Sequence, residues 1–167
     1  MLPLAASAVA GKDPTTSSLL FSTAESLKAA MLTQWTGRWF LRGWIGNGQS
    51  LGTDRLFLEP QPFVIIGGFA NAEQQEALLR SIKEILDDPS PAGALILYPP
   101  LDTTGNTFDG GGLTPGTDIN GGIWPAMNGF LTWAYFLRNP GLGWTSLKKN
   151  TLATHAAVYP NVWYGIW

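Results

Sequence analysis

The sequence contains no cysteine, which excludes disulfide bonds and cysteine-ligated metal sites. A single histidine, His155, cannot build a histidine-rich zinc site by itself. Charged residues make up 13% of the chain, about half the usual share for a soluble domain, so we expect part of the surface to pack against other protein. The net charge is −2 and Lys and Arg form no run, which argues against nucleic acid as a partner.

Long apolar runs are also missing. No stretch reaches the roughly 18 apolar residues that a membrane-spanning helix needs, so a membrane is not an expected partner. The chain opens with MLPLAASAVAG, which is typical either of the end of a signal peptide or of a helix that continues a larger fold. Because this segment lacks a basic start and Pro3 interrupts it, we favour the helix. We expect a cytoplasmic protein.

Against these absences stand eight tryptophans in 167 residues, which is well above ordinary usage. A buried indole N–H needs a hydrogen-bond partner, so core packing alone rarely calls for so many. Sugar-binding clefts use tryptophan because its flat face packs on the C–H face of a pyranose ring. Packing in the core or in an interface is the alternative role for each of them.

The periodicity of apolar residues predicts a mostly helical protein. We expect helices over residues 15–32, 71–88, 127–137 and 144–157, and a short buried helix within 56–69, where the VII run leaves a strand as the alternative. Residues 94–100 read as a short extended segment. The aromatic stretch 35–44 fits one helical face, but its glycines favour a turn. The long polar loop 101–122 is expected to be functional.

Together these elements predict an all-α fold of helical hairpins with functional loops at one end. The chain ends in PNVWYGIW, which is apolar to its last residue, whereas termini are usually polar. We therefore interpret residues 1–167 as a single fragment of a larger domain.

Carboxylates in loops are the candidates for glycoside chemistry, which needs a carboxylic acid to protonate the leaving oxygen. They are Asp54, Glu59, Asp102, Asp109 and Asp118. Asp118 is the preferred catalytic residue because it lies in the long loop beside the Gly-Gly-Ile-Trp element, and Glu59 is a second candidate base. The alternative for each is a solvated or turn-forming role. No phosphate-cradling glycine loop and no GxSxG motif occurs, and His155 is interpreted as structural.

Four segments carry a family resemblance: RWFLRGWIGNGQSLG, RLFLEPQPFVIIGGFA, LYPP and NGGIWPAMN. Their order resembles that of the family-94 glycoside phosphorylases from about Trp35 to Tyr135. The resemblance implies part of an (α/α)6 barrel whose active site lies in loops at one end. It also implies inverting cleavage of a β-glycosidic bond in glucose-type oligosaccharides, with inorganic phosphate as a possible co-substrate and no cofactor.

The chain departs from the family pattern in three places. The family's catalytic acid lies in a Trp-Asn-Asp-like motif upstream of RWFLR, and this chain has no such motif, so the resemblance implies an acid outside the chain. Ile119 stands where the family has a sugar-contacting Glu, and Ala126 stands where it has a phosphate-contacting His. The residues to which the resemblance assigns sugar contacts are Asp118, Asn120, Gly121, Gly122, Trp124, Arg42 and Gln61.

The segment GIWPAMN, residues 122–128, is also similar to the joint between a sugar-facing loop and an inner helix in trehalase-like and glucosidase (α/α)6 hydrolases, in which Asn128 would anchor the joint. Those enzymes use water in place of phosphate, and the loss of the family His favours water here. A non-catalytic, tryptophan-rich sugar-binding or structural helical domain is a further alternative. The expected partners are an oligosaccharide, the remainder of the barrel and a second copy of the chain.

Overall fold

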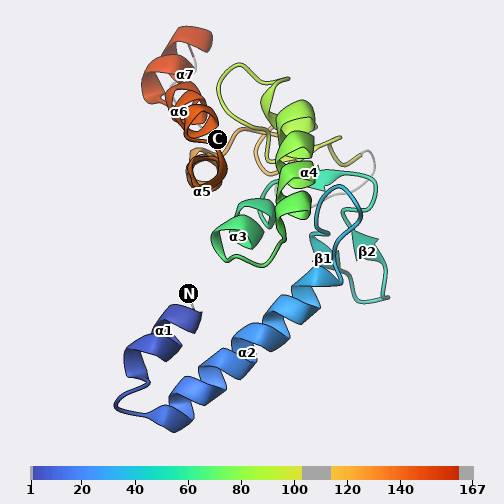
Figure 1. The fold of residues 1–167 in the computed structure, drawn as a ribbon. Coiled ribbons are helices and arrows are strands. Elements are labelled where there is room, and N and C mark those ends of the chain that lie inside the picture. Colours follow the sequence, from blue (N-terminus) through green and yellow to red (C-terminus); the bar gives the residue numbers. More distant parts are fainter. Residues whose placement is uncertain (1, 103–113, 162–167) are drawn as a thin grey trace.

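The computed structural model describes residues 2–102 and 114–161, and helices dominate these ranges (Figure 1). The helices are α1 (Leu2–Val9), α2 (Pro14–Leu32), α3 (Gln61–Ile66), α4 (Ala72–Ile82), α5 (Pro125–Arg138), α6 (Pro140–Lys149) and α7 (Leu152–Val158), with a π-helical segment η1 (Lys83–Asp87) directly after α4. The prediction of an all-α fold is confirmed at this level. Its finer part, a partial (α/α)6 barrel, stays a prediction.

Two very short antiparallel strand pairs accompany the helices in the described ranges. β1 (Gly43–Trp44) pairs with β2 (Ser50–Leu51), and β3 (Leu56–Phe57) pairs with β4 (Leu97–Tyr98). The second pair joins the chain before α3 to the segment that follows η1. It therefore holds together two loops whose paired residues, Phe57 and Leu97, are 40 positions apart in sequence. None of the helices in the described ranges is long and apolar enough to cross a membrane.

The helical hairpin of α1 and α2 extends away from the other helices (Figure 1). The helix predicted for residues 15–32 is confirmed, and Asp13 caps it by accepting a hydrogen bond from the Thr16 N–H at 2.9 Å. Ala6 and Ser17 are buried where the two helices meet, and the Ser17 hydroxyl donates to the Ala6 carbonyl oxygen. Little of the rest of this hairpin is buried, so its outer apolar side chains face solvent.

The hydrophobic core lies where α3, α4 and α5 meet the β3–β4 pair. Apolar side chains of α4 and α5 fill it, and each contributes about 1.5–3 kcal/mol when fully buried. Phe63 of α3 and Phe130 of α5 add a tilted ring contact of 4.7 Å at its edge. Core residues that are completely inaccessible include Phe40, Leu56, Leu58, Val64, Leu78, Ile82, Leu86, Leu131 and Ala134.

Several predicted boundaries differ from the structure. The stretch 35–44 forms a turn closed by a Trp35–Phe40 bridge, as its glycines favoured, and ends in β1. The short buried helix expected within 56–69 is confirmed as Gln61–Ile66, which contains the VII run, and a two-residue strand at Leu56–Phe57 precedes it. The single helix predicted for 144–157 is wrong. Asn139 caps α6 before Pro140, and Thr151 starts α7 separately.

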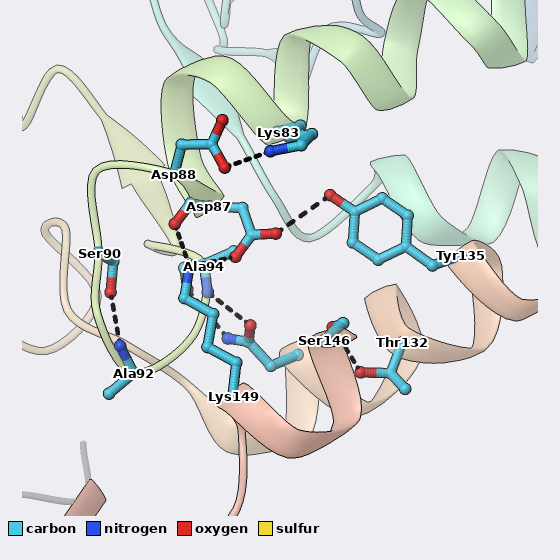
Figure 2. A network of polar contacts seen from close by, with 11 residues as sticks. Lys83, Asp87, Asp88, Ser90, Ala92, Ala94, Thr132, Tyr135, Ser146 and Lys149 are labelled. Carbon is cyan, nitrogen blue, oxygen red and sulfur yellow. Dashed lines mark hydrogen bonds and ion pairs between the residues drawn. The ribbon is translucent and has the colours of Figure 1, made fainter. Parts of the chain in front are cut away.

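A polar network braces η1 against α5 and α6 (Figure 2). Lys149 donates to the Asp87 carboxylate at 2.7 Å and to the Asp87 carbonyl oxygen, and both side chains are mostly buried. The Tyr135 hydroxyl donates to the other Asp87 oxygen at 3.4 Å. The network therefore fixes the start of the loop 88–95, which forms one wall of the larger pocket described below.

Candidate functional site

A tight turn at residues 114–124 leads into α5 and carries most of the predicted site residues. Asp118 has a left-handed backbone with φ 45°, and Gly121 has φ 105°. A Cβ at Gly121 would lie 3.3 Å from the Gly116 Cα, so both the conformation and the close approach require glycine there. Trp124 is extended and Pro125 is the first residue of α5, so this segment joins a loop to a helix, as predicted.

Asn128 holds this joint in place. Its side-chain oxygen accepts from the Ala94 N–H at 2.7 Å, and its amide donates to the carbonyl oxygens of Ala94 and Trp124 at 2.9 and 3.0 Å. The side chain is almost completely buried, with 1% exposed. The predicted anchoring role is confirmed, because Asn128 ties the first turn of α5 to the loop 88–95.

Two of the predicted sugar ligands form the same kind of two-point contact with backbone. Asn120 accepts from the Leu101 N–H at 2.6 Å and donates to the Leu101 carbonyl oxygen at 3.0 Å. Gln61 does the same with Phe40, at 3.0 and 2.8 Å, and also donates to the Phe57 carbonyl oxygen. Gln61 and Asn120 are both inaccessible, so the expected sugar contact of each is corrected to a role in holding the backbone of a neighbouring loop.

A pocket of about 360 Å³ lies on one side of the turn, and we name it the Trp44 pocket. The Trp44 side chain is 54% exposed, so its ring is open to a ligand. Beside it the Arg42 Nε donates to the Glu59 Oε2 at 3.0 Å, and both side chains are partly exposed. Such a pair is weak in solvent and can exchange its bonds for those of a ligand. The lining residues are Arg42, Gly43, Trp44, Leu51, Phe57, Glu59, Leu97, Leu101, Ile119 and Asn120.

A larger pocket of about 780 Å³ lies along the same turn, and we name it the His155 pocket. Among the described residues, three segments line it: the loop after η1, the turn itself and the helix α7 with the residue that follows it. The His155 Nε2 is buried without a hydrogen-bond partner. The lining residues are Pro89, Ser90, Pro91, Leu95, Gly116, Thr117, Asp118, Gly121, Gly122, Ile123, His155 and Tyr159.

The structure divides the predicted site residues between these pockets. Arg42 and Asn120 line the Trp44 pocket, whereas Asp118, Gly121 and Gly122 line the His155 pocket. Trp124 lines neither. It packs against the core, and its Nε1 is buried without a partner. Asp109, the other carboxylate singled out in the long loop, lies outside the described residues.

Sequence reasoning missed two features of these pockets. The sequence singled out Trp124 and not Trp44, although the position of Trp44 after Arg42 and Gly43 in a glycine-rich turn is a signal for exposure. His155 was assigned a structural role because no acidic residue lies within one helical turn of it. Its pocket neighbour Asp118 is 37 positions away in sequence, so only the fold brings them to one cavity. The described residues contain no cluster of three or more potential metal ligands.

Comparison with known proteins agrees with the sequence motifs. A search of curated proteins finds no match. Residues 8–146, which include both strand pairs, the turn and α5, match the model of the glycosyl hydrolase 94 superfamily, catalytic domain. This match covers most of the chain, and the chain therefore belongs to the glycosyl hydrolase 94 superfamily.

Proposed function

We propose that this chain is part of an enzyme that cleaves a β-glycosidic bond in glucose-type oligosaccharides with inversion. Membership of the catalytic-domain family is the observation that carries this proposal. The partners we propose are the oligosaccharide, the remaining helices of the barrel and a second copy of the chain, and the location we propose is the cytoplasm. The catalytic acid is proposed to lie outside this chain, because the motif that supplies it is absent here.

The Trp44 pocket supports sugar binding. An exposed indole offers the flat apolar surface on which a pyranose ring packs, while Arg42 supplies N–H donors and Glu59 supplies acceptors for its hydroxyls. Ile119, which stands at the position of the family's sugar-contacting Glu, lines the same pocket as Glu59. We therefore propose that Glu59 provides the carboxylate that position 119 has lost.

The nucleophile that we propose is water. Ala126 lies in the first turn of α5 and carries no group that binds phosphate, although its position is that of the family's phosphate-contacting His. Inverting cleavage by water requires a carboxylate that removes a proton from the water molecule. Asp118 is exposed and is the chain's preferred candidate for this role, with Glu59 as the second.

The test is an assay of the full-length gene product on β-linked glucose disaccharides with and without inorganic phosphate. We expect cleavage in both conditions. Strict dependence on phosphate would contradict water as the nucleophile. Disaccharide binding without any cleavage would instead support the alternative of a non-catalytic sugar-binding domain, for which the exposed Trp44 pocket is the supporting observation.

The Trp44→Ala variant tests the pocket itself. Loss of the stacking surface should lower kcat/KM about tenfold. Trp133→Ala is the matched control, because Trp133 is 49% exposed on α5 and lines neither pocket. Equal effects of the two substitutions would show that Trp44 has no special part in sugar binding.

A further inference from the structure

An ion pair between Lys149 and Asp87 lies behind two walls of the His155 pocket. Asp87 ends η1, and the loop 88–95, which forms one wall, begins at the next residue. Lys149 ends α6, and α7, which forms another wall through His155, begins at Leu152. Neither Lys149 nor Asp87 is a lining residue, so both act on the pocket through the segments that follow them.

Lys149 holds both the side chain and the backbone of Asp87 (Figure 2). Its ammonium group donates to the Asp87 carboxylate at 2.7 Å and also to the Asp87 carbonyl oxygen. The Tyr135 hydroxyl donates to the second carboxylate oxygen at 3.4 Å. The Lys149 and Asp87 side chains are only 20% and 15% exposed, so salt screens this pair much less than a surface pair. Asp87 is therefore fixed in position and in orientation.

The first residues of the loop pass this position on to the pocket. The Asp87 carbonyl oxygen that Lys149 binds also accepts from the N–H of Ser90, a lining residue, at 3.2 Å. Pro89 lies between Asp87 and Ser90, and its ring fixes its φ at about −65°. This short segment has little freedom to bend by itself, so the lining residues follow a shift of Asp87.

The far end of the loop is held independently. The Leu95 N–H donates to the Leu86 carbonyl oxygen at 3.0 Å, and Asn128 binds both the N–H and the carbonyl oxygen of Ala94. Because this end is fixed, a change at Asp87 tilts the loop instead of displacing all of it. The segment 89–91 is then the part that moves relative to the rest of the pocket.

The end of α6 carries α7 in a similar way. The Lys148 carbonyl oxygen accepts from the Thr151 hydroxyl at 3.0 Å and from the Thr154 hydroxyl at 2.7 Å, and Thr151 also caps the first turn of α7. These bonds attach α7 closely to the end of α6. A movement of Lys149 relative to Asp87 therefore changes the distance between α7 and the loop after η1.

We propose that Lys149 is a positioning residue that sets the width of the His155 pocket between the loop 88–95 and α7. Lys149 lies beyond residues 8–146, which match the family model, and the family resemblance assigns it no contact. Because the pocket also contains Asp118, the proposed base, this width determines how tightly substrate is held beside that carboxylate. That last step rests on the proposed function, whereas the control of the width by Lys149 does not.

The width can be measured as a distance between two spin labels. The chain contains no cysteine, so labels on Pro91→Cys and Tyr159→Cys mark the loop and the end of α7 alone. Both positions are exposed lining residues. In this labelled chain Lys149→Met, which removes the charge and keeps most of the side-chain length, should broaden the distance distribution and shift it to longer distances.

Further variants separate positioning from a general loss of structure. Lys148→Met removes a charge from the adjacent, exposed position of α6 and should leave the distances unchanged. Lys149→Arg keeps the charge and the N–H donors and should return the distances towards those of the parent. If Lys149→Met does not fold, Asp87→Asn takes its place with the same shift expected, because it removes the charge of the carboxylate. Distances that match the parent, or an equal shift in Lys148→Met, would overturn the proposal.

Kinetics of the full-length gene product test the consequence for the substrate. Lys149→Met should raise KM for a β-linked glucose disaccharide about tenfold and leave kcat within about twofold, because a wider pocket weakens binding of the ground state and the transition state alike. Lys148→Met should change neither constant. If the labelled walls move and KM stays the same, the link between width and substrate is refuted. If the gene product cleaves nothing and the walls still move, the proposed function fails and the positioning role of Lys149 stands.

Discussion

Three buried carboxamide side chains fix the loops around both pockets. Asn128, Asn120 and Gln61 each bind the N–H and the carbonyl oxygen of one distant residue, much as a neighbouring strand would. An amide is suited to this because it is a donor and an acceptor at once. A carboxylate of the same shape has no donor at neutral pH, so Asn-to-Asp and Gln-to-Glu changes separate chemistry from packing.

Asn128→Asp should lower the free energy of unfolding by about 2–4 kcal/mol at pH 7. The substitution leaves the carbonyl oxygens of Ala94 and Trp124 without their donor and buries a charge beside them. Urea unfolding measures the change. Asn161→Asp is the control, because Asn161 is exposed and the same substitution there should change stability by less than about 0.5 kcal/mol. Equal stabilities of the two variants would contradict the anchoring role.

The same residues explain what the sequence could and could not predict about the site. Asn128 was correctly expected to anchor the joint, because it lies four residues after Trp124 and one helical turn joins them. Gln61 was expected to contact sugar, yet it lies in the core. A carboxamide forms the same hydrogen bonds with a sugar hydroxyl as with backbone, so its residue type does not indicate which partner the fold supplies.

Tyr135 makes the stability of the folded protein depend on pH in the alkaline range. Burial, and after it the nearby Asp87 carboxylate, raises the pKa of Tyr135 above its ordinary value of 10.0. The folded protein therefore keeps the phenol protonated at pH values where the unfolded chain releases the proton. The contribution of Tyr135 to stability is fully present below pH 10 and is lost as the pH rises above it.

The Tyr135→Phe variant isolates this effect. In the parent protein, Tyr135 should reduce the free energy of unfolding by up to about 1.4 kcal/mol for each pH unit above its unfolded pKa, and the variant should lack this part of the decline. Urea unfolding of both proteins between pH 8 and pH 11 measures the difference in slope. If the free energy of unfolding fell with the same slope in both proteins above pH 10, Tyr135 would not be the source of this pH dependence.

At the scale of elements, α5 and α6 pack closely because one glycine lets them approach. A Cβ at Gly143 would come within 2.4 Å of the Phe136 ring, so Gly143→Ala forces the ring or the helix to move. We expect a loss of about 1–3 kcal/mol in the free energy of unfolding.

Gly129→Ala is the matched control in α5. A Cβ at Gly129 meets nothing within 4 Å, so the substitution should gain about 0.5–1 kcal/mol from helix propensity. Thermal melting of both variants measures the two changes, and their opposite signs are the diagnostic result. If Gly143→Ala were also stabilising, the close approach would not limit the packing of the two helices.

Local signals decided which elements were predictable. The helix at Ala72–Ile82 carries a complete capping box between Asn71 and Gln74, and the sequence predicted its start to within one residue. The π-helical segment Lys83–Asp87 has no side-chain cap, and its last residue, Asp87, is held by Lys149 of α6, a contact between positions 62 residues apart. The break between α6 and α7 was missed, although Thr151 caps the second helix by accepting a hydrogen bond from the Thr154 N–H.

At the scale of the whole molecule, apolar side chains line the outer faces of two parts of the chain. Trp133 and Leu137 lie one turn apart on α5, and Trp144 and Leu147 lie on one side of α6. Leu19 and Leu27 are exposed on α2. Each such side chain would contribute about 1.5–3 kcal/mol if another surface covered it. This agrees with the sparse charge of the sequence, from which packing against other protein was expected.

These exposed faces should make the isolated chain bind a hydrophobic dye and associate as its concentration rises. Sedimentation velocity between about 5 and 200 µM should give a weight-average mass that increases with concentration, since association follows mass action. The double variant Trp133→Gln, Trp144→Gln should reduce both signals while its urea midpoint stays near that of the parent, because neither indole is part of the core. A parent chain that stays monomeric and binds no dye would contradict the prediction that other helices, of the barrel or of a second copy, cover these faces.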